Sequence, residues 1–339
     1  MRYFLLVLFL CSSAYAEALH FKRIAVANNP CEAYSLANSV DFHPHKNVLC
    51  VTYTFGNRVV LYDQTLRIVQ TLANPEAELQ APQHAVFTPD GKVLVVANWM
   101  SQTFTLYAKQ AQGGFSATPT AVIFTPEKLA PYRFHGIAFS RCGQFLAVAY
   151  GAGSDYDRAI GIFKYDPTAL TLTLVHCLCG EKEVLGVPKG IAFAPDGNAL
   201  LVTFSDLNAL AVYPFSKKHQ TLAYSPRQIV RGPDSQIFRP EDVKLSQDGT
   251  LLALSNSDAG NVSIFPFNPH NNTITQSSPR ATINKKLVFP HGLAFSPDGT
   301  LLAITQFGGI HSDEKGDIFW SHITNPSEAK IFIYTVESN

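Results

Sequence analysis

The sequence predicts an all-β protein, a six-bladed β-propeller built from four-stranded antiparallel blades. Three observations predict it. One sequence phrase recurs six times at intervals of about fifty residues, and each copy has the pattern of a β-hairpin. In addition, a strand near the N-terminus can supply the fourth strand that the last repeat lacks. Four strands per repeat at this period are typical of propellers. Seven blades are the less favoured count, because a seventh needs about 40 spare residues in one of the gaps between copies.

Each copy contains an apolar strand, a turn of the Pro-Asp-Gly kind and a second apolar strand. The copies span residues 39–53, 84–98, 136–150, 190–204, 242–256 and 292–306, and their anchor positions are Phe42, Phe87, Phe139, Phe193, Leu245 and Phe295. Asp-Gly supplies the positive φ that a tight turn needs, and proline fixes the entry into the turn. Both strands are nearly continuous apolar runs, as expected for sheets packed on both faces.

The remaining strands of each blade follow the hairpin. A third, alternating strand comes after every copy, as in RVVLYD (58–63), and the first five copies add a weaker fourth strand, such as LRIVQTL (66–72). The sixth copy ends with its third strand, whereas FKRIAVAN (21–28) has no hairpin of its own. An unpaired sheet edge invites aggregation, so we expect this N-terminal strand to complete the last blade beside residues 331–336.

Residues 1–16 have the pattern of a secretory signal peptide. A basic residue precedes a short apolar run that ends in Ala-x-Ala, and the run is too short to span a bilayer. We therefore expect residues 17–339 to form a single propeller domain in a secreted or periplasmic protein. Five cysteines remain after the signal peptide, a number too small and too odd for a disulfide framework.

The charge balance excludes some classes of partner. The chain has 26 basic and 26 acidic residues, so it lacks the basic footprint of a nucleic-acid-binding protein. No later apolar stretch is long enough for an integral membrane segment. We expect a monomer whose partner is a small molecule or another protein.

The ends of the innermost strands mark a candidate site. With each anchor counted as zero, position −4 is expected to pair with position +11 at the open end of the hairpin, and the six hairpins should together ring one mouth of the central channel. Position −4 is polar in every copy: Asn38, Gln83, His135, Lys189, Glu241 and His291. Position +11 is mostly hydrogen-bonding or aromatic: Tyr53, Asn98, Tyr150, Phe204, Asn256 and Gln306. His84, at −3, takes the place of Gln83 if that hairpin contains a bulge.

Two interpretations of this ring are open. Strand ends surface into water, so the polar residues are also what a solvent-filled channel needs. The alternative is a ligand site with convergent polar groups, whose expected ligand-binding residues are Gln83, His84, Asn98, Tyr150, Lys189, Asn256, Gln306 and Trp320.

Glu241, His135 and His291 are the candidate catalytic residues, because a carboxylate and an imidazole can act as acid and base. The same three side chains are competent ligands for a divalent cation, with Asp242 and Asn256 as further candidates. Lys189 argues against a metal and for an anionic substrate.

The longest connection, residues 307–329, is expected on the same face as the ring. Loops of this length are commonly functional. Gly308-Gly309 offers a hinge, and Ile318-Phe319-Trp320 an apolar patch. The segment is either a lid over a small-molecule site or a surface loop packed on its own blade.

The repeat phrase resembles a known family. The patterns HxxFxPDG, as in residues 84–91, and HGxAFSPDGxxLA, as in residues 291–303, are similar to the YVTN and lactonase-type propeller repeats of secreted and bacterial proteins. The resemblance covers nearly the whole mature chain and specifies a blade rather than a reaction. Relatives include seven-bladed phosphogluconolactonase-like hydrolases, six-bladed gluconolactonase-like metal enzymes, and binding propellers.

Two functions follow. The first is a binding propeller that holds a small ligand or a protein partner at its channel mouth and loop face. The alternative is a lactonase-like hydrolase of the phosphogluconolactonase or gluconolactonase type, with either a divalent cation or Glu241 and a histidine at the ring.

Overall fold

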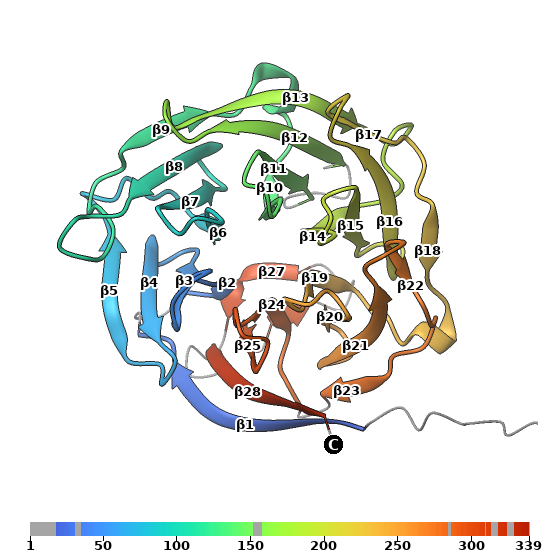
Figure 1. Ribbon diagram of the computed structural model, residues 1–339. Coiled ribbons are helices and arrows are strands. Elements are labelled where there is room, and N and C mark those ends of the chain that lie inside the picture. Colours follow the sequence, from blue (N-terminus) through green and yellow to red (C-terminus); the bar gives the residue numbers. More distant parts are fainter. Residues whose placement is uncertain are drawn as a thin grey trace, which may run out of the picture.

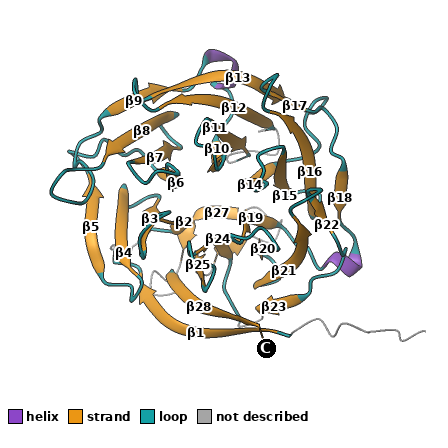
Figure 2. Cartoon of the chain, in the orientation of Figure 1, coloured by secondary structure: helices purple, strands orange, loops and turns teal. Residues whose placement is uncertain are grey.

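The computed structural model describes residues 18–30, 35–151, 158–283, 286–308, 310–312, 318–323 and 329–338 of the chain. These residues form six antiparallel blades arranged radially around a central axis (Figure 1). Apart from two short 3-10 turns, Glu127–Leu129 and Pro233–Ser235, their regular structure is all strand (Figure 2). Within this part of the chain, no helix is long and apolar enough to cross a membrane. The predicted fold is confirmed, and the expected signal peptide lies outside the described residues.

The blades follow one another in chain order. Blade 1 contains β2 (Ala37–Phe42), β3 (Val48–Tyr53), β4 (Arg58–Asp63) and β5 (Ile68–Ala73). Blade 2 contains β6 (Pro82–Phe87), β7 (Val93–Asn98), β8 (Thr103–Ala108) and β9 (Ala121–Phe124). Blade 3 contains β10 (Phe134–Phe139), β11 (Phe145–Tyr150), β12 (Ala159–Asp166) and β13 (Thr171–Cys179).

In blades 4 and 5 the outermost strand is broken into two short pieces that pair with the same neighbour. Blade 4 contains β14 (Pro188–Phe193), β15 (Ala199–Phe204), β16 (Ala209–Ser216), β17 (Thr221–Leu222) and β18 (Gln228–Val230). Blade 5 contains β19 (Pro240–Leu245), β20 (Leu251–Asn256), β21 (Asn261–Asn268), β22 (Thr273–Ile274) and β23 (Ala281–Ile283). Blade 6 contains β24 (Pro290–Phe295), β25 (Leu301–Gln306), β28 (Lys330–Ser338) and β1 (Leu19–Asn28).

The N-terminal strand closes the ring. β1 pairs antiparallel with β28, from Leu19 opposite Ser338 to Asn28 opposite Lys330, and Figure 1 shows the blue and red strands side by side at the rim. This confirms the predicted pairing of residues 21–28 with the end of the chain. β1 therefore covers the edge of β28 and is itself the outermost strand of blade 6.

Apolar packing between neighbouring blades forms the core. Buried residues fall into one cluster for each pair of adjacent blades, including the pair of blades 6 and 1. For example, Val148 and Phe104 belong to the cluster between blades 2 and 3. The hairpin turns have the predicted chemistry, since Gly91 and Gly197 have φ of 68° and 69°. Repetition of this packing around the axis fixes where the innermost strands point.

The pairing at the open end of each hairpin differs by one residue from the pairing that the sequence analysis predicted. Position −5 rather than −4 pairs with position +11, as in Phe134 opposite Tyr150 and Pro240 opposite Asn256. A bulge follows in each innermost strand, so that positions −4 and −3 together oppose the single residue at +10. The irregularity expected only for Gln83 and His84 is present in all six blades.

Candidate functional site

All six residues of position −4 line one cavity at the mouth of the channel. This mouth cavity has a volume of about 390 Å³, within the range of roughly 300–1,000 Å³ that is usual for sites of drug-sized ligands. We call the six side chains its floor: Asn38, Gln83, His135, Lys189, Glu241 and His291.

Hydroxyl groups at position +10 hold the floor in place. In blade 5, Ser255 Oγ accepts the N–H of Asp242, which the bulge removes from the strand ladder, and donates to the carbonyl of His291 in blade 6. Thr305 Oγ1 similarly donates to the carbonyl of Asn38, and Thr52 Oγ1 to that of Gln83. One buried hydroxyl thus accepts an N–H that the bulge leaves unpaired and also hydrogen-bonds to the carbonyl of the floor residue in the next blade.

Three floor side chains converge. The Nε2 atom of His135 lies 3.1 Å from Oε2 of Glu241, and Nε2 of His291 lies 3.6 Å from the same oxygen. Their potential ligand atoms all lie within 4.8 Å of one another. The two imidazole rings are 5.1 Å apart, and all three side chains are almost completely buried. The structure therefore brings together the three residues predicted to carry catalysis.

The hydrogen bonds determine the tautomer of His291. Its Nδ1 lies 3.1 Å from the carbonyl oxygen of Asn38, and because a carbonyl oxygen only accepts, Nδ1 carries the proton. Burial lowers the pKa of His291 to about 3, and the charge of Glu241 offsets this only in part. His291 is therefore neutral at pH 7 and turns the lone pair of Nε2 toward Glu241.

Glu241 and His135 have complementary protonation states. Burial by itself would raise the pKa of Glu241, but Lys189, His135 and His291 outweigh it and hold the pKa well below its usual range. Burial and the charge of Lys189 lower the pKa of His135. At pH 7 a neutral His135 thus donates its Nε2 proton to the Glu241 carboxylate.

The charges around the floor favour an anion over a cation. Lys189 and Arg239 are the basic residues of the cavity lining and Glu241 is its acidic residue. Nε of Arg239 lies 3.8 Å from Glu241. Two imidazoles and a carboxylate are suitable metal ligands in kind, but a divalent cation here would face the two positive side chains at close range. The residues present therefore do not fit a resident metal ion, and Asp242 and Asn256 do not line the cavity.

The +11 side chains have a different place from the one predicted. Asn98, Asn256 and Gln306 do not line the cavity; their side-chain oxygens instead accept the N–H of Gln80, Phe238 and Val288, seven residues before the respective anchors. They hold the segments that lead into the innermost strands. The buried ring of Tyr150 stacks on Phe134, with their centroids 5.2 Å apart.

Of the two remaining predicted residues, His84 is the one that the structure places relative to the floor. His84 is buried behind it, and its Nε2 has no hydrogen-bond partner among the described residues. Trp320 belongs to β27 (Ile318–Ile323), which pairs with β26 (Ile310–Ser312), and its side chain lies outside the described part of the chain. In Figure 1, β27 crosses the centre of the ring in projection.

The sequence analysis missed the residues just outside the strands. Positions −6 and +12 contribute Arg239, Trp99, Leu36, Phe289 and Phe307 to the cavity lining. Backbone hydrogen bonds extend the hairpins to these positions, since the N–H of Phe307 donates to the carbonyl of Phe289 at 3.1 Å. Proline occupies position −5 in four blades. It shows where the innermost strand begins and could have identified the residue before it, at −6, as a candidate lining residue.

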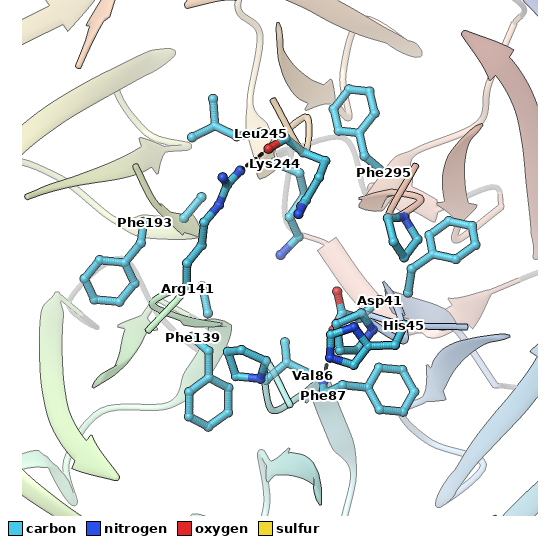
Figure 3. A pocket seen from close by; sticks show the side chains of 17 residues that line it. Asp41, His45, Val86, Phe87, Phe139, Arg141, Phe193, Lys244, Leu245 and Phe295 are labelled. Carbon is cyan, nitrogen blue, oxygen red and sulfur yellow. Dashed lines mark hydrogen bonds between the residues drawn. The ribbon is translucent and has the colours of Figure 1, made fainter. Parts of the chain in front are cut away.

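A second cavity opens at the opposite end of the channel, between the hairpin turns (Figure 3). This turn-face cavity measures about 400 Å³, with Asp41 and Lys244 at the channel and Arg141 at its edge. Its cations have partners within the protein: Lys244 pairs with Asp242 at 3.6 Å, and Arg141 donates to the carbonyl oxygen of Gln247. Arg239 of the mouth cavity likewise pairs with Glu241 and Asp258, so the feature that distinguishes the mouth cavity is its buried acid–base cluster.

Solved structures resemble the chain in fold. A candidate 6-phosphogluconolactonase from Bacteroides uniformis matches with a TM-score of 0.59 at 14% identity, over 87% of this chain and 88% of that one. A candidate 6-phosphogluconolactonase from Bacteroides fragilis matches with a TM-score of 0.56 at 16% identity, over 84% and 82%. A luciferin-regenerating enzyme matches with a TM-score of 0.63 at 11% identity, over 92% and 95%. At these identities the likeness shows the fold alone.

No curated protein matches the chain. The family model described as lactonase, 7-bladed beta-propeller matches residues 35–235 and 188–290, which together span more than half of the sequence. The match includes Asn38, Gln83, His135, Lys189 and Glu241 of the floor and stops just before His291. The chain therefore belongs to the lactonase β-propeller family, with six blades in its described residues where the family description has seven.

Proposed function

We propose that the protein is a hydrolase that opens a lactone in its mouth cavity. The observation that carries this proposal is the convergence of His135, Glu241 and His291 beside Lys189 in a propeller of the lactonase family. The family match favours hydrolysis over the binding function that the sequence analysis put first. Both functions would use the same cavity, so measurement of turnover separates them.

The protein's own residues supply the chemistry. The neutral Nε2 of His291 takes a proton from water as the water oxygen bonds to the lactone carbonyl carbon. The Glu241 carboxylate, 3.6 Å from this nitrogen, stabilises the imidazolium that forms. Negative charge on the former carbonyl oxygen is stabilised by Lys189 and Arg239. The ring C–O bond then breaks, and the leaving oxygen takes the proton back from His291, which yields a hydroxy acid.

The low pKa of His291 suits this sequence of steps. The positive charge of Lys189 contributes to the low pKa of His291. Negative charge that develops beside Lys189 in the transition state offsets this effect, so His291 becomes more basic when it accepts the proton. The excess of positive charge in the lining also matches the carboxylate of the product. No step needs a metal ion.

Hydrolysis of a lactone panel in a pH-stat at pH 7 tests the proposal. The panel contains glucono-δ-lactone, 6-phosphogluconolactone and γ-lactones with and without alkyl substituents. We expect turnover of at least one class, unchanged by a chelator, and a loss of about 10²–10⁴ in kcat/KM for His291→Asn. The matched control is His219→Asn, at an exposed turn residue between β16 and β17 that does not line the cavity. Absence of turnover, or full activity of His291→Asn, contradicts the proposal.

The N-terminal pattern supports action outside the cytoplasm, in the periplasm or after secretion. Cleavage after Ala16 in cells, read by N-terminal sequencing of the mature protein, is the expected result. A protein that keeps Met1 in the cytoplasmic fraction would contradict export.

A further inference from the structure

The apolar and charged residues of the mouth cavity lie on opposite halves of the ring. Its large apolar residues, which we call the wall, come from blades 6, 1 and 2: Leu36, Phe55, Trp99, Phe289 and Phe307. Its charged residues and His135 come from blades 3, 4 and 5: His135, Lys189, Arg239 and Glu241. Because blades 6, 1 and 2 are consecutive around the axis (Figure 1), the wall forms one continuous arc that faces the charged half.

Stacked aromatic rings form the part of the wall that belongs to blade 6. The ring of Phe307 lies parallel to those of Phe289 and His291, at centroid distances of 5.2 and 4.1 Å and interplanar angles of 13° in both cases. Leu36 packs with Phe307 and Phe289 in a small cluster of its own, apart from the core between the blades. The stack thus runs from the acid–base cluster on the floor outward along blade 6.

Two residues of the lining are held in a strained backbone conformation. Phe289 and Arg239 have φ of 54° and 46°, in the left-handed region that bulky side chains rarely adopt. Each immediately precedes the proline that begins an innermost strand, β24 or β19. The guanidinium of Arg239 lies 5.8 Å from the ring centroid of Phe289. Ala81, which precedes Pro82 in blade 2, has the same conformation with φ of 54°, so the surroundings of the strand entry impose it.

Exposed apolar residues continue the wall toward solvent. Phe55 and Met100 are 42% and 65% exposed, and Val288 is 38% exposed beside Phe289 in sequence. Most of the other large exposed apolar side chains of the described residues lie on outermost strands at the rim, such as Phe124 on β9. Exposed apolar surface next to a cavity indicates an apolar ligand or partner.

We infer that the cavity takes an amphipathic lactone, whose ring lies on the floor and whose alkyl or acyl substituent lies along the wall of blades 6, 1 and 2. The carbonyl end meets the charged half, which contributes Lys189 and Arg239. On the side of the wall the polar lining residues are Asn38, Thr54, Gln83 and His291. Asn38 and Thr54 hydrogen-bond to each other there, and the five large apolar side chains favour an alkyl substituent over the hydroxyl groups of a sugar lactone. The inference rests on the proposed function and names its substrate class.

A chain-length series tests the inference. The substrates are γ-valerolactone, γ-hexalactone, γ-heptalactone, γ-octalactone and γ-nonalactone, with glucono-δ-lactone for comparison, and kcat/KM is measured for the full-length protein. Each methylene that reaches the wall is expected to raise kcat/KM about twofold to fourfold. We expect Phe55→Ala and Trp99→Ala each to reduce this rise by at least half on a logarithmic scale. The matched control is Phe124→Ala, which removes the same ring as Phe55→Ala from the rim and should leave the series unchanged.

Each outcome decides the question. A flat series, or faster hydrolysis of glucono-δ-lactone than of γ-nonalactone, overturns the amphipathic substrate and leaves the hydrolase proposal standing. If no lactone is hydrolysed, the hydrolase proposal fails, and calorimetric titration with hexanoate, octanoate and decanoate decides the ligand class. Affinity that rises with chain length and falls in Phe55→Ala supports an amphipathic ligand, whereas absence of any rise overturns it.

Discussion

Replacement of His291 by asparagine should remove a defined part of the pH dependence of stability. The pKa of His291 is about 3 in the folded protein against an ordinary value of 6.5. As pH falls, the unfolded chain therefore binds a proton at this residue before the folded chain does. Its contribution to stability is complete above pH 6.5 and is lost progressively between pH 6.5 and 3.

The magnitude follows from the slope of 1.36 kcal/mol per pH unit for one proton. Between pH 7 and pH 5 the unfolded chain takes up nearly one proton at His291 and the folded chain almost none, which costs about 2 kcal/mol. Glu241 contributes little in this window, because its carboxyl is ionised in both states. His135 and His84 act in the same direction as His291, so the informative quantity is the difference between wild type and variant.

Urea unfolding at pH 7 and pH 5 measures this difference. Asparagine keeps an N–H donor for the carbonyl of Asn38 and does not titrate, so wild type should lose about 2 kcal/mol more than His291→Asn over this range. His219→Asn, at an exposed site, should behave as wild type. Equal losses in wild type and His291→Asn would mean that folding does not lower the pKa of His291, and its neutral state at pH 5 in the folded protein would be wrong.

Three further predictions follow from the floor and the channel. Lys189→Met should lower kcat about 10²–10³-fold with a smaller change in KM, measured on the best lactone, because the lost charge acts mainly in the transition state. Asp41→Asn should stabilise the protein at pH 7 by up to about 3 kcal/mol, since burial raises the pKa of Asp41 to about 6; this gain should decrease as the pH falls through 6 and vanish below about pH 3, where the carboxyl is protonated in both states. Gly190→Ala should lower Tm strongly, because an added Cβ would lie 2.5 Å from Cα of Asp242 in the next blade; an unchanged Tm would contradict the tight packing of the innermost strands.

The repeat in the sequence was sufficient to predict the floor of the cavity. Each Pro-Asp-Gly turn lies at the same distance from its anchor, so a polar residue at one offset in an apolar strand could be assigned to the mouth without knowledge of the exact pairing. That is why His135, Glu241 and His291, far apart in sequence, were correctly expected to lie together.

The pairing itself was wrong by one residue. In blades 1, 4, 5 and 6 a buried hydroxyl at position +10, such as that of Thr52 or Ser255, accepts an N–H that the bulge leaves unpaired. The sequence analysis treated these as ordinary strand residues. Asn98 and Asn256 were consequently assigned to the cavity, although they hold the segments that enter the strands.

The wall could not be recognised from composition. An aromatic residue that faces a ligand and one that faces the core look alike in a sequence, and Phe289 and Phe307 lie next to strands that are mostly apolar. Their role depends on the left-handed backbone of Phe289 and on the stack with His291, both of which are tertiary features. A proline after Phe289 was the available signal, and it marks only where the strand begins.

A crystal structure of the Glu241→Gln variant soaked with γ-nonalactone tests the central claim most directly. The account predicts that the lactone occupies the mouth cavity, with its carbonyl oxygen within hydrogen-bond distance of Nζ of Lys189 and its alkyl chain along Trp99 and Phe289. A lactone in the turn-face cavity beside Asp41, or one whose chain lies over blades 3 and 4, would contradict it.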